Sequence, residues 1–429
     1  IMQANKVSSQ VAFLSAAQTL LSIARPWFIA TCLLISAIVL LPNAAQLDTN
    51  YQLLLKYLPY ALGLIVIILG QQFVQGRISM AAVNLLVGYA IIQTQLQAPL
   101  EQENIRAYFT LLSIFWPLNF FIIYWLPERK LASPFGIFLC AFISFQITAG
   151  YLFTHCLPDF SKYLEDYLAL HPFQENSAHF MAQWMLPLLS SVILFLMYVV
   201  LFTHTLIKRD RSDCALLISL IASILICAWF DQAAISSVFS SSVACALLIT
   251  LLINSHDLAF LDELTGLPGR RALMNELKHC GKYYCIVMAD IDHFKKFNDT
   301  HGHDTGDDVL RVVAQELAKV RGGGKAFRYG GEEFTLLFKR KSAEESEPYI
   351  ESIRQSIESY PLIIRDKKNR PAKKDKNSKK IQGSTTQVQV TVSFGIAQRQ
   401  AEQKAEDVMK SADQALYRAK EQGRNCIAR

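Results

Sequence analysis

The chain has 429 residues, of which 52% are hydrophobic and only 18% are charged, and its formal net charge is +6. A soluble protein averages about 25% charged residues, so this composition excludes an ordinary soluble enzyme, a disordered chain and a fibrous protein. Residues 1–255 hold only 11 of the 42 Lys and Arg and 11 of the 36 Asp and Glu. The length suggests two or three domains, and the uneven charge indicates a membrane part followed by a soluble part.

The first part contains eight apolar stretches that approach the roughly 20 residues needed to cross a bilayer as a helix. They lie near Trp27–Leu41, Tyr57–Val74, Ile78–Leu96, Tyr108–Leu126, Phe135–Phe153, Met185–Leu206, Cys214–Trp229 and Ile235–Leu252. The first and seventh are the shortest. The sequence therefore predicts an all-α transmembrane bundle of about eight helices, with the lipid bilayer as its partner.

Charges in the short loops predict the orientation of this bundle. The loops on the N-terminal side carry most of the Lys and Arg, including Arg77, Arg129, Lys130 and Lys208, whereas the opposite loops are mainly acidic. Positive loops face the cytoplasm, so both termini are predicted to be cytoplasmic. No span centre holds Asp, Glu, Lys or Arg, which argues against an ion-coupled transporter. The acidic loop from Pro158 to Gln183 is either a sensing surface or a solvated connection.

The connection to the soluble part is short. No Gly or Pro occurs between the last span and Gly266, so a helix is expected to continue across it. We divide the chain into a transmembrane sensory domain (1–253), a linker helix (254–262) and a soluble domain (263–429).

Apolar periodicity predicts helices and strands of an α+β type in the soluble domain. Helices are expected at Arg270–Cys280, Asp307–Val320, Ser342–Tyr360 and Lys404–Gln422, and strands at Tyr283–Asp290, Lys325–Tyr329, Phe334–Lys339 and Val388–Ala397. A polar loop is predicted from Asn298 to Gly306. The expected fold is an antiparallel sheet covered by helices.

Charged groups gather at three places in this domain. The buried strand ends in carboxylates at Asp290 and Asp292, and Gly330 to Glu333 read Gly-Gly-Glu-Glu between two strands. Lys420 lies on the last helix and Arg424 lies just past it. Glycines allow a tight turn and a close backbone approach. Three such clusters, at a strand end, at a hairpin turn and at a helix end, indicate a site for a metal or a phosphate rather than general surface charge.

Four blocks with these residues resemble the GGDEF-domain diguanylate cyclases, in the GGEEF form of the signature. They are Asp262-x-Leu-Thr-Gly-Leu-Pro268, Asp290-Ile-Asp-His-Phe-Lys-Lys-Phe-Asn298 with Gly302-His303-x-x-Gly306-Asp307, Arg328-Tyr-Gly-Gly-Glu-Glu-Phe334, and Ala419-Lys420-x-x-Gly423-Arg424-Asn425. The resemblance covers about residues 258–429 and implies a palm-like nucleotidyl-cyclase fold. The first part is similar to the multi-span sensory modules of this family in architecture only.

The resemblance implies that a homodimer condenses two GTP into cyclic di-GMP and two pyrophosphates, with Mg²⁺ or Mn²⁺ as cofactor. It gives each site residue a role: Asp290, the Ile291 carbonyl, Glu332 and Glu333 for the metal; Glu332 and Glu333 for catalysis; Phe294, Lys295, Lys420 and Arg424 for phosphate; Asn298 and Asp307 for guanine; and Arg328, Gly330 and Gly331 for the signature turn. Whether Glu333 is a metal ligand or a base stays open. The implied location is a bacterial inner membrane, with the catalytic domain in the cytoplasm.

Two departures and two alternatives accompany this interpretation. The family's inhibitory product site pairs an Arg with an Asp three residues later, but here Arg321 is followed by Gly324, so the site is incomplete. The basic insert from Arg365 to Lys380 is either a solvated loop or a contact with anionic lipid, and its lack of aromatic residues disfavours nucleic acid. The alternative functions are a catalytically inactive GTP-binding receptor and a transporter gated by the soluble domain. The stimulus is unknown.

Overall fold

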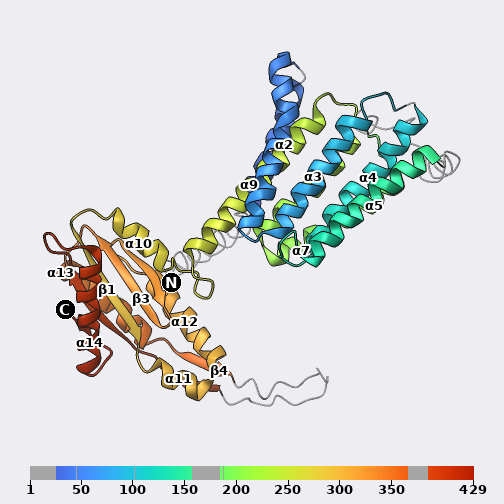
Figure 1. The fold of residues 1–429 in the computed structure, drawn as a ribbon. Coiled ribbons are helices and arrows are strands. Elements are labelled where there is room, and N and C mark those ends of the chain that lie inside the picture. Colours follow the sequence, from blue (N-terminus) through green and yellow to red (C-terminus); the bar gives the residue numbers. More distant parts are fainter. Residues whose placement is uncertain (1–25, 45, 101, 157–183, 187, 366–384) are drawn as a thin grey trace, which may run out of the picture. The chain divides into compact units, whose positions relative to one another are not determined.

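The structure is a computed structural model that describes residues 26–44, 46–100, 102–156, 184–186, 188–365 and 385–429. The chain separates into two compact units, residues 1–255 and 256–429 (Figure 1). Each unit is described by itself below.

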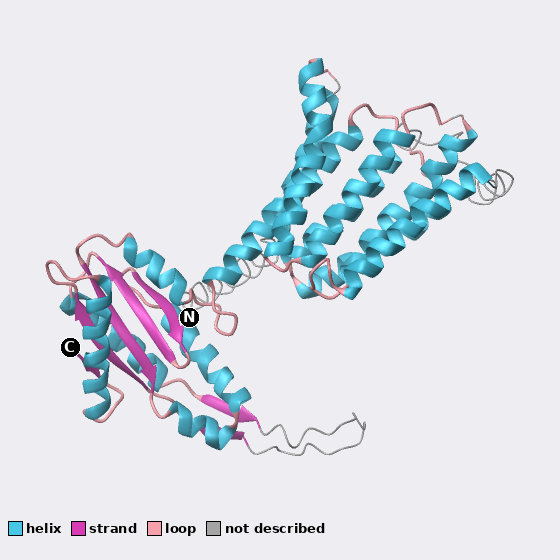
Figure 2. Cartoon of the chain, in the orientation of Figure 1, coloured by secondary structure: helices cyan, strands magenta, loops and turns pink. Residues whose placement is uncertain are grey.

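The described residues of the first unit form helices joined by turns and loops, and no strand occurs among them (Figure 2). Eight helices there are long and apolar enough to cross a membrane: Pro26–Ala44, α2 (Thr49–Gln72), α3 (Gly76–Gln95), α4 (Glu103–Trp125), α5 (Pro134–Cys156), α7 (Leu188–Lys208), α8 (Arg211–Ala228) and α9 (Ile235–Phe260). The predicted set of eight apolar helices is confirmed. Helix α9 runs on to Phe260 without a break, through most of the predicted linker.

Burial distinguishes inner from outer helices. More than half of each apolar window in α3, α4, α8 and α9 is buried, whereas less than a third is buried in the other four. The outer helices expose large apolar side chains, among them Phe145, Phe195 and Tyr57. A surface of this kind suits hydrocarbon rather than water, so the helical unit is built as a membrane module.

A buried ionic cluster lies where α3 and α8 begin. The Arg77 guanidinium, with 7% of its side chain exposed, donates to Glu128 (2.9 Å), Asp213 (2.7 Å) and Asp210 (3.3 Å). The Asp213 side chain is fully buried, and Lys208 lies 3.1 Å from its other oxygen. We call these five residues the Arg77 cluster. Since an unpaired buried charge is costly, the cluster fixes how the ends of these helices meet.

Gln75, which directly precedes α3, attaches the same corner to α9. Its side-chain nitrogen donates to the Leu251 carbonyl (3.1 Å) and to the Ser255 hydroxyl (2.8 Å). Asn254 of α9 donates to the Ser212 hydroxyl of α8 (2.9 Å). The start of α3 is therefore bound to both α8 and α9.

The second unit is built on a five-stranded sheet of order β2-β3-β1-β6-β7. The strands are β1 (Tyr284–Ile291), β2 (Gly324–Gly330), β3 (Glu333–Lys339), β6 (Val392–Gln398) and β7 (Ile427–Ala428). All neighbours are antiparallel except β6 and β7. A separate pair, β4 (Leu362–Arg365) and β5 (Thr385–Val388), flanks the basic insert. The predicted α+β class is confirmed.

Helices cover both faces of this sheet, which explains why every residue of β1 is buried. The helices are α10 (Arg270–Lys278), α11 (Phe294–His301), α12 (His303–Ala318), α13 (Ala343–Glu358) and α14 (Ala405–Glu421). Alternate β1 residues, such as Val287 and Ala289, pack with α12 and α13. Ile286 and Met288 pack instead with α10 and α14. Because side chains alternate along a strand, the next position on the α14 face is Asp290.

The predicted polar loop from Asn298 to Gly306 is wrong. Helix α11 continues to His301 and α12 begins at His303, with Gly302 between them at φ +83°. A positive φ costs glycine little, so this one residue makes the whole turn. Several of the polar residues that suggested a loop, such as Asp299, Thr300 and Asp304, are exposed on these two helices.

Candidate functional site

The carboxylates of the candidate site meet at one edge of the sheet. Asp290 near the end of β1 is paired in register with Glu333 at the start of β3, and Glu332 occupies the adjoining turn. Asp290 faces α14, where the Lys420 ammonium lies 2.8 Å from its carboxylate. The structure thus brings together three predicted acids and one predicted base from three separate segments.

The surroundings of the three carboxyl groups at this edge make each of them harder to ionise. Burial raises the pKa of Asp290, against the hydrogen bond from Lys420. Burial also raises the pKa values of Glu332 and Glu333, and the charge of Asp290 raises both further. Each acid therefore holds its proton more tightly than in water. A bound cation would reverse that tendency, so the donor set suits a hard cation such as Mg²⁺.

Protein side chains alone do not complete a metal shell here. In the described ranges, no three His, Cys, Asp or Glu side chains are grouped closely enough to hold a metal ion. Mg²⁺ commonly uses one or two carboxylates and takes its other ligands from water and phosphate. Ile291, the last residue of β1, pairs with Val392 and lies beside Asp290 in the chain.

The signature turn is held in place by Arg328. Gly331 adopts φ +52°, the kind of conformation that favours glycine. The Arg328 guanidinium donates to the Gly331 carbonyl (2.8 Å) and to Asp262 (2.7 Å). Burial opposes ionisation of Asp262, but hydrogen bonds from Thr265 and Arg328 bring its pKa below the ordinary value. Arg328 therefore links the turn to the segment that follows α9.

Asp292 has a different environment from Asp290. Its carboxylate accepts hydrogen bonds from the hydroxyls of Thr391 and Ser393 (both 2.7 Å) and from the Asn425 backbone N–H (3.0 Å). These contacts hold the segment of Arg424 and Asn425, which both have positive φ. Asp292 is thus a positioning residue for Arg424, a role that the sequence pattern did not distinguish from metal binding.

Arg424 approaches the acids from the turn after α14. Its charge acts on Asp290, lowering the pKa of that carboxyl against the larger effect of burial. At the other side of β1, Phe294 is buried at the first turn of α11 and Lys295 is exposed. The phosphate-binding candidates therefore lie on two sides of the same strand end.

The two guanine candidates lie at the α11–α12 junction. The Asn298 side-chain oxygen is buried without a hydrogen-bond partner in the part of the chain that the structure describes. It lies against Gly306, where an added Cβ would be 1.8 Å from that oxygen. Asp307 follows Gly306 in α12 and is half-buried. An unpaired buried acceptor is costly, so Asn298 stands out among the polar side chains of this domain.

The position where the resemblance would put the acid of an inhibitory site, Gly324, has little room for a side chain. Arg321 precedes β2, and Gly324 begins that strand. An added Cβ at Gly324 would lie 2.6 Å from the Phe338 ring and 2.8 Å from Val320. A side chain at this position therefore requires its neighbours to move. The acidic loop 158–183 and the basic insert, apart from Arg365, lie outside the described residues.

Residues 259–426 match the family described as "Diguanylate cyclase, GGDEF domain". Diguanylate cyclase VdcA of Vibrio cholerae is 39% identical over 173 residues, which cover 39% of this chain and 46% of that protein. The response regulator PleD of Caulobacter vibrioides is 33% identical over 185 residues, or 41% and 37% of the two chains. The chain thus spans less than half the length of these relatives.

A solved structure of the coiled coil and GGDEF domain of DgcB from Caulobacter crescentus in complex with c-di-GMP was also found. It is 33% identical, and the match covers 42% of this chain and 91% of that one with a TM-score of 0.36.

Proposed function

Because residues 259–426 form a GGDEF domain, we propose that the protein is a membrane-bound diguanylate cyclase. It would join two GTP into cyclic di-GMP and release two pyrophosphates. One observation carries the proposal: Asp290, Glu332, Glu333 and Lys420 converge on one edge of the sheet. An inactive GTP-binding receptor has no need of this complete set.

Mg²⁺, with Mn²⁺ as a substitute, fits the acids of this edge. Asp290, the Ile291 carbonyl and Glu332 would hold it, and when bound it would supply positive charge to the triphosphate. Glu333 would either add a metal ligand or take the proton of the attacking ribose 3′-hydroxyl. The raised pKa of Glu333 suits the second role, since a base works best near the ambient pH.

The bases would neutralise the triphosphate. Lys420 pairs with Asp290 in the structure, and we propose that it turns to the β- and γ-phosphates when GTP binds. Arg424, whose segment is held by Asp292, would contribute from the turn after α14. Phe294 and Lys295 are the first residues of α11, and the first N–H groups of a helix have no acceptor within it. Such groups at a helix N-terminus suit anionic oxygens.

Guanine would be selected by Asn298 and Asp307. Guanine presents N1–H and N2–H donors together, and a carboxylate accepts such a pair, whereas adenine lacks it. The unpaired oxygen of Asn298 supplies a further acceptor. These residues therefore predict GTP over ATP.

The product requires two copies of the chain. Each 3′-hydroxyl must attack the α-phosphorus of the other nucleotide, and one domain has one nucleotide site. A homodimer that places the two GTP face to face would remove much of the entropic barrier. The membrane module would regulate this arrangement, with both termini and the catalytic domain in the cytoplasm as the loop charges predict.

The direct test incubates the purified full-length protein with GTP and Mg²⁺ and measures cyclic di-GMP. Glu333→Gln is expected to lower turnover by about 100-fold or more. Glu344→Gln, on the exposed side of α13, is the matched control and should keep full activity. GTP binding without product from the wild type would favour the inactive receptor, and full activity of Glu333→Gln would refute the proposed site.

Gly306→Ala is expected to raise the KM for GTP about tenfold, with a smaller effect on kcat. The new methyl group would displace the Asn298 side chain that now lies 1.8 Å from its position, and one lost hydrogen bond to guanine accounts for about that factor. Steady-state kinetics check this. Gly269→Ala is the control, because its Cβ would have ordinary contacts. An unchanged KM would remove Asn298 from the guanine site.

Product inhibition through Arg321 is expected to be weak. The position three residues later is Gly324, packed against Phe338, so half of the charge and hydrogen-bond pair for the product is missing. Titration of cyclic di-GMP into the cyclase assay should give the same inhibition for the wild type and Arg321→Ala. Tight inhibition that disappears in Arg321→Ala would contradict this prediction.

A further inference from the structure

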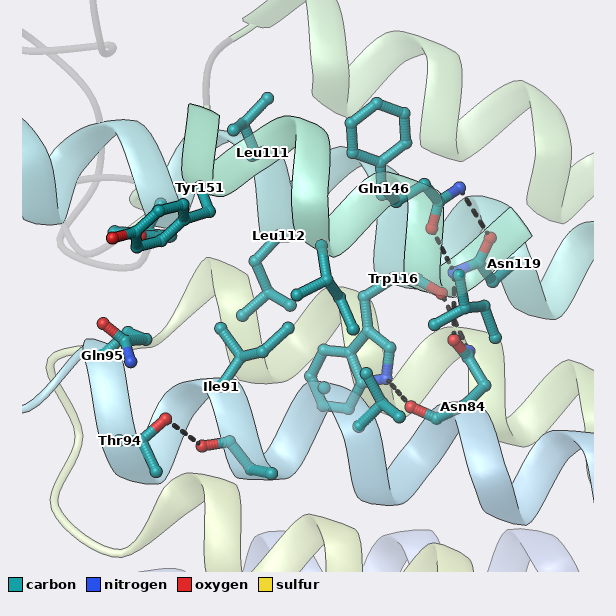
Figure 3. Close-up of a pocket in the computed structure, with 18 residues that line it drawn as sticks. Asn84, Ile91, Thr94, Gln95, Leu111, Leu112, Trp116, Asn119, Gln146 and Tyr151 are labelled. Atoms are coloured by element: carbon teal, nitrogen blue, oxygen red, sulfur yellow. Dashed lines mark hydrogen bonds between the residues drawn. The ribbon is translucent and has the colours of Figure 1, made fainter. Parts of the chain in front are cut away.

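The membrane module contains a cavity that the cyclase chemistry does not use. It has a volume of about 370 Å³ and lies among α3, α4 and α5 (Figure 3). Its walls are mainly aliphatic and aromatic, including Ile91, Leu112 and Trp116. Gly88 allows the Trp116 ring to lie directly against α3, since a Cβ there would be 2.2 Å from the ring. The size is typical of small-molecule sites.

Three amide side chains form one end of this cavity. Asn84, Asn119 and Gln146 come from α3, α4 and α5 and lie together away from Tyr151 and Gln95 at the other end (Figure 3). Asn119 donates to Asn84 (3.1 Å) and to Gln146 (2.9 Å), and Gln146 donates back to Asn119 (3.1 Å). Asn84 and Asn119 are only 1% and 3% exposed. Polar groups placed this deep in a span are costly and indicate function.

The amide group retains unused donors. Each amide nitrogen has two N–H bonds, and Asn119 uses both. Asn84 donates one to the Trp116 carbonyl (3.2 Å), and Gln146 donates one to Asn119. Over the described ranges, the contacts leave one N–H on Asn84 and one on Gln146 without an acceptor. A ligand oxygen at this end would satisfy them.

The charge of the lining restricts the ligand. None of the residues around the cavity is Asp, Glu, Lys, Arg or His, so an ionised group would be buried without a counter-charge. We propose that this cavity binds a neutral, mainly apolar small molecule whose carbonyl oxygen accepts hydrogen bonds from Asn84 and Gln146. This site is independent of the proposed cyclase reaction.

A bilayer phospholipid does not meet this requirement. Its ester carbonyls stay at the headgroup level, while its chain ends reach the middle of the membrane. Asn84 and Gln146 lie near the middle of α3 and α5, where a phospholipid offers only methyl and methylene groups. The ligand is therefore a free molecule that enters the module as a whole.

Benzophenone, a neutral and photoreactive diaryl ketone, is a suitable probe. The full-length protein in detergent is irradiated with it, and the modified peptides are identified by mass spectrometry. Adducts are expected on the cavity-lining parts of α3, α4 and α5. An excess of 2-tridecanone should lower this labelling about fivefold or more, whereas tridecane, which lacks the carbonyl, should not.

Two variants test separately the amide donors and the empty volume of the cavity. Gln146→Met removes a donor at similar volume, and Gly150→Leu fills the cavity from a position where a Cβ has ordinary contacts. Both should lower labelling at least about fivefold. Leu152→Phe, on the exposed side of α5, is the control and should label like the wild type. Gel filtration confirms that each variant is folded.

The opposite results would overturn the proposal. Equal competition by tridecane would show that the cavity accepts any alkyl chain, including those of lipids. Labelling spread over exposed helix faces, or unchanged in both Gln146→Met and Gly150→Leu, would show that no ketone site exists there.

Discussion

Asp290→Asn is expected to abolish cyclase activity, with a loss of about 100-fold or more, and to leave the folded protein at least as stable as the wild type. Both effects have one origin. Burial raises the pKa of this carboxyl group, and the charge of Asp292 raises it further, against the lowering effects of Lys420 and Arg424. The ionised form is therefore less favourable in the folded protein than in the unfolded chain, which is a cost that an uncharged amide avoids.

The stability difference between Asp290→Asn and the wild type should depend on pH. A carboxyl group with a raised pKa binds its proton more tightly in the folded state, so it favours folding at low pH. That contribution is lost as the pH rises through the ordinary and then the raised pKa. Thermal unfolding without Mg²⁺ should therefore show the advantage of Asp290→Asn only above the ordinary carboxyl range. Lys420 loses a partner, but 34% of its side chain is exposed and water replaces much of that interaction.

Asp292→Asn is the matched comparison and should behave in the opposite way. Asp292 accepts three hydrogen bonds, and bonds to a charged acceptor contribute about 1.5–3 kcal/mol each, so this variant should unfold at a lower temperature. A stability loss in Asp290→Asn as large as that in Asp292→Asn would show that Asp290 is a structural residue.

Arg77→Met is expected to lower the stability of the membrane module by about 3–5 kcal/mol, the usual cost of removing one partner from a buried ion pair. The reason is Asp213, whose fully buried side chain would keep Lys208, itself 48% exposed, as its one remaining ion-pair partner in the described part of the chain. Thermal unfolding of the full-length protein in detergent measures the loss.

The second substitution tests the cause. Adding Asp213→Asn to Arg77→Met removes the unpaired charge and should recover a large part of the stability, because the two sites are directly coupled. Arg129→Met, at an exposed position, should change stability by no more than about 0.5 kcal/mol. Additive losses in the double variant would contradict the explanation.

Local patterns predicted the elements whose signal lies in a single segment. Hydropathy alone indicates the eight long helices, and a continuous apolar run ending in acid indicates β1. The hairpin around Gly331 follows from glycines between two strand-like runs. These features depend on period and length, which a sequence displays directly.

Features that depend on tertiary neighbours were missed. Asp290 and Asp292 look alike in sequence, but the strand ends between them, and only one reaches α14. The residues from Asn298 to Gly306 have loop composition, yet Phe294 packs them as helix against the core. Asn84, Asn119 and Gln146 lie far apart in sequence, and each comes from a different, mainly apolar span. An amide within a span is the signal that would have identified them.

Helix α3 has one further consequence for how this protein responds to its surroundings. Gln75, the residue just before this helix, is hydrogen-bonded to α9, and the middle of α3 borders the amide end of the cavity. A helix is stiff along its axis, because each residue is bonded to the fourth before it. A bound molecule that displaces α3 along its axis by a fraction of one residue's rise would therefore displace the hydrogen bonds between Gln75 and α9 by the same distance. Binding in the cavity would then move α9 without any change in secondary structure.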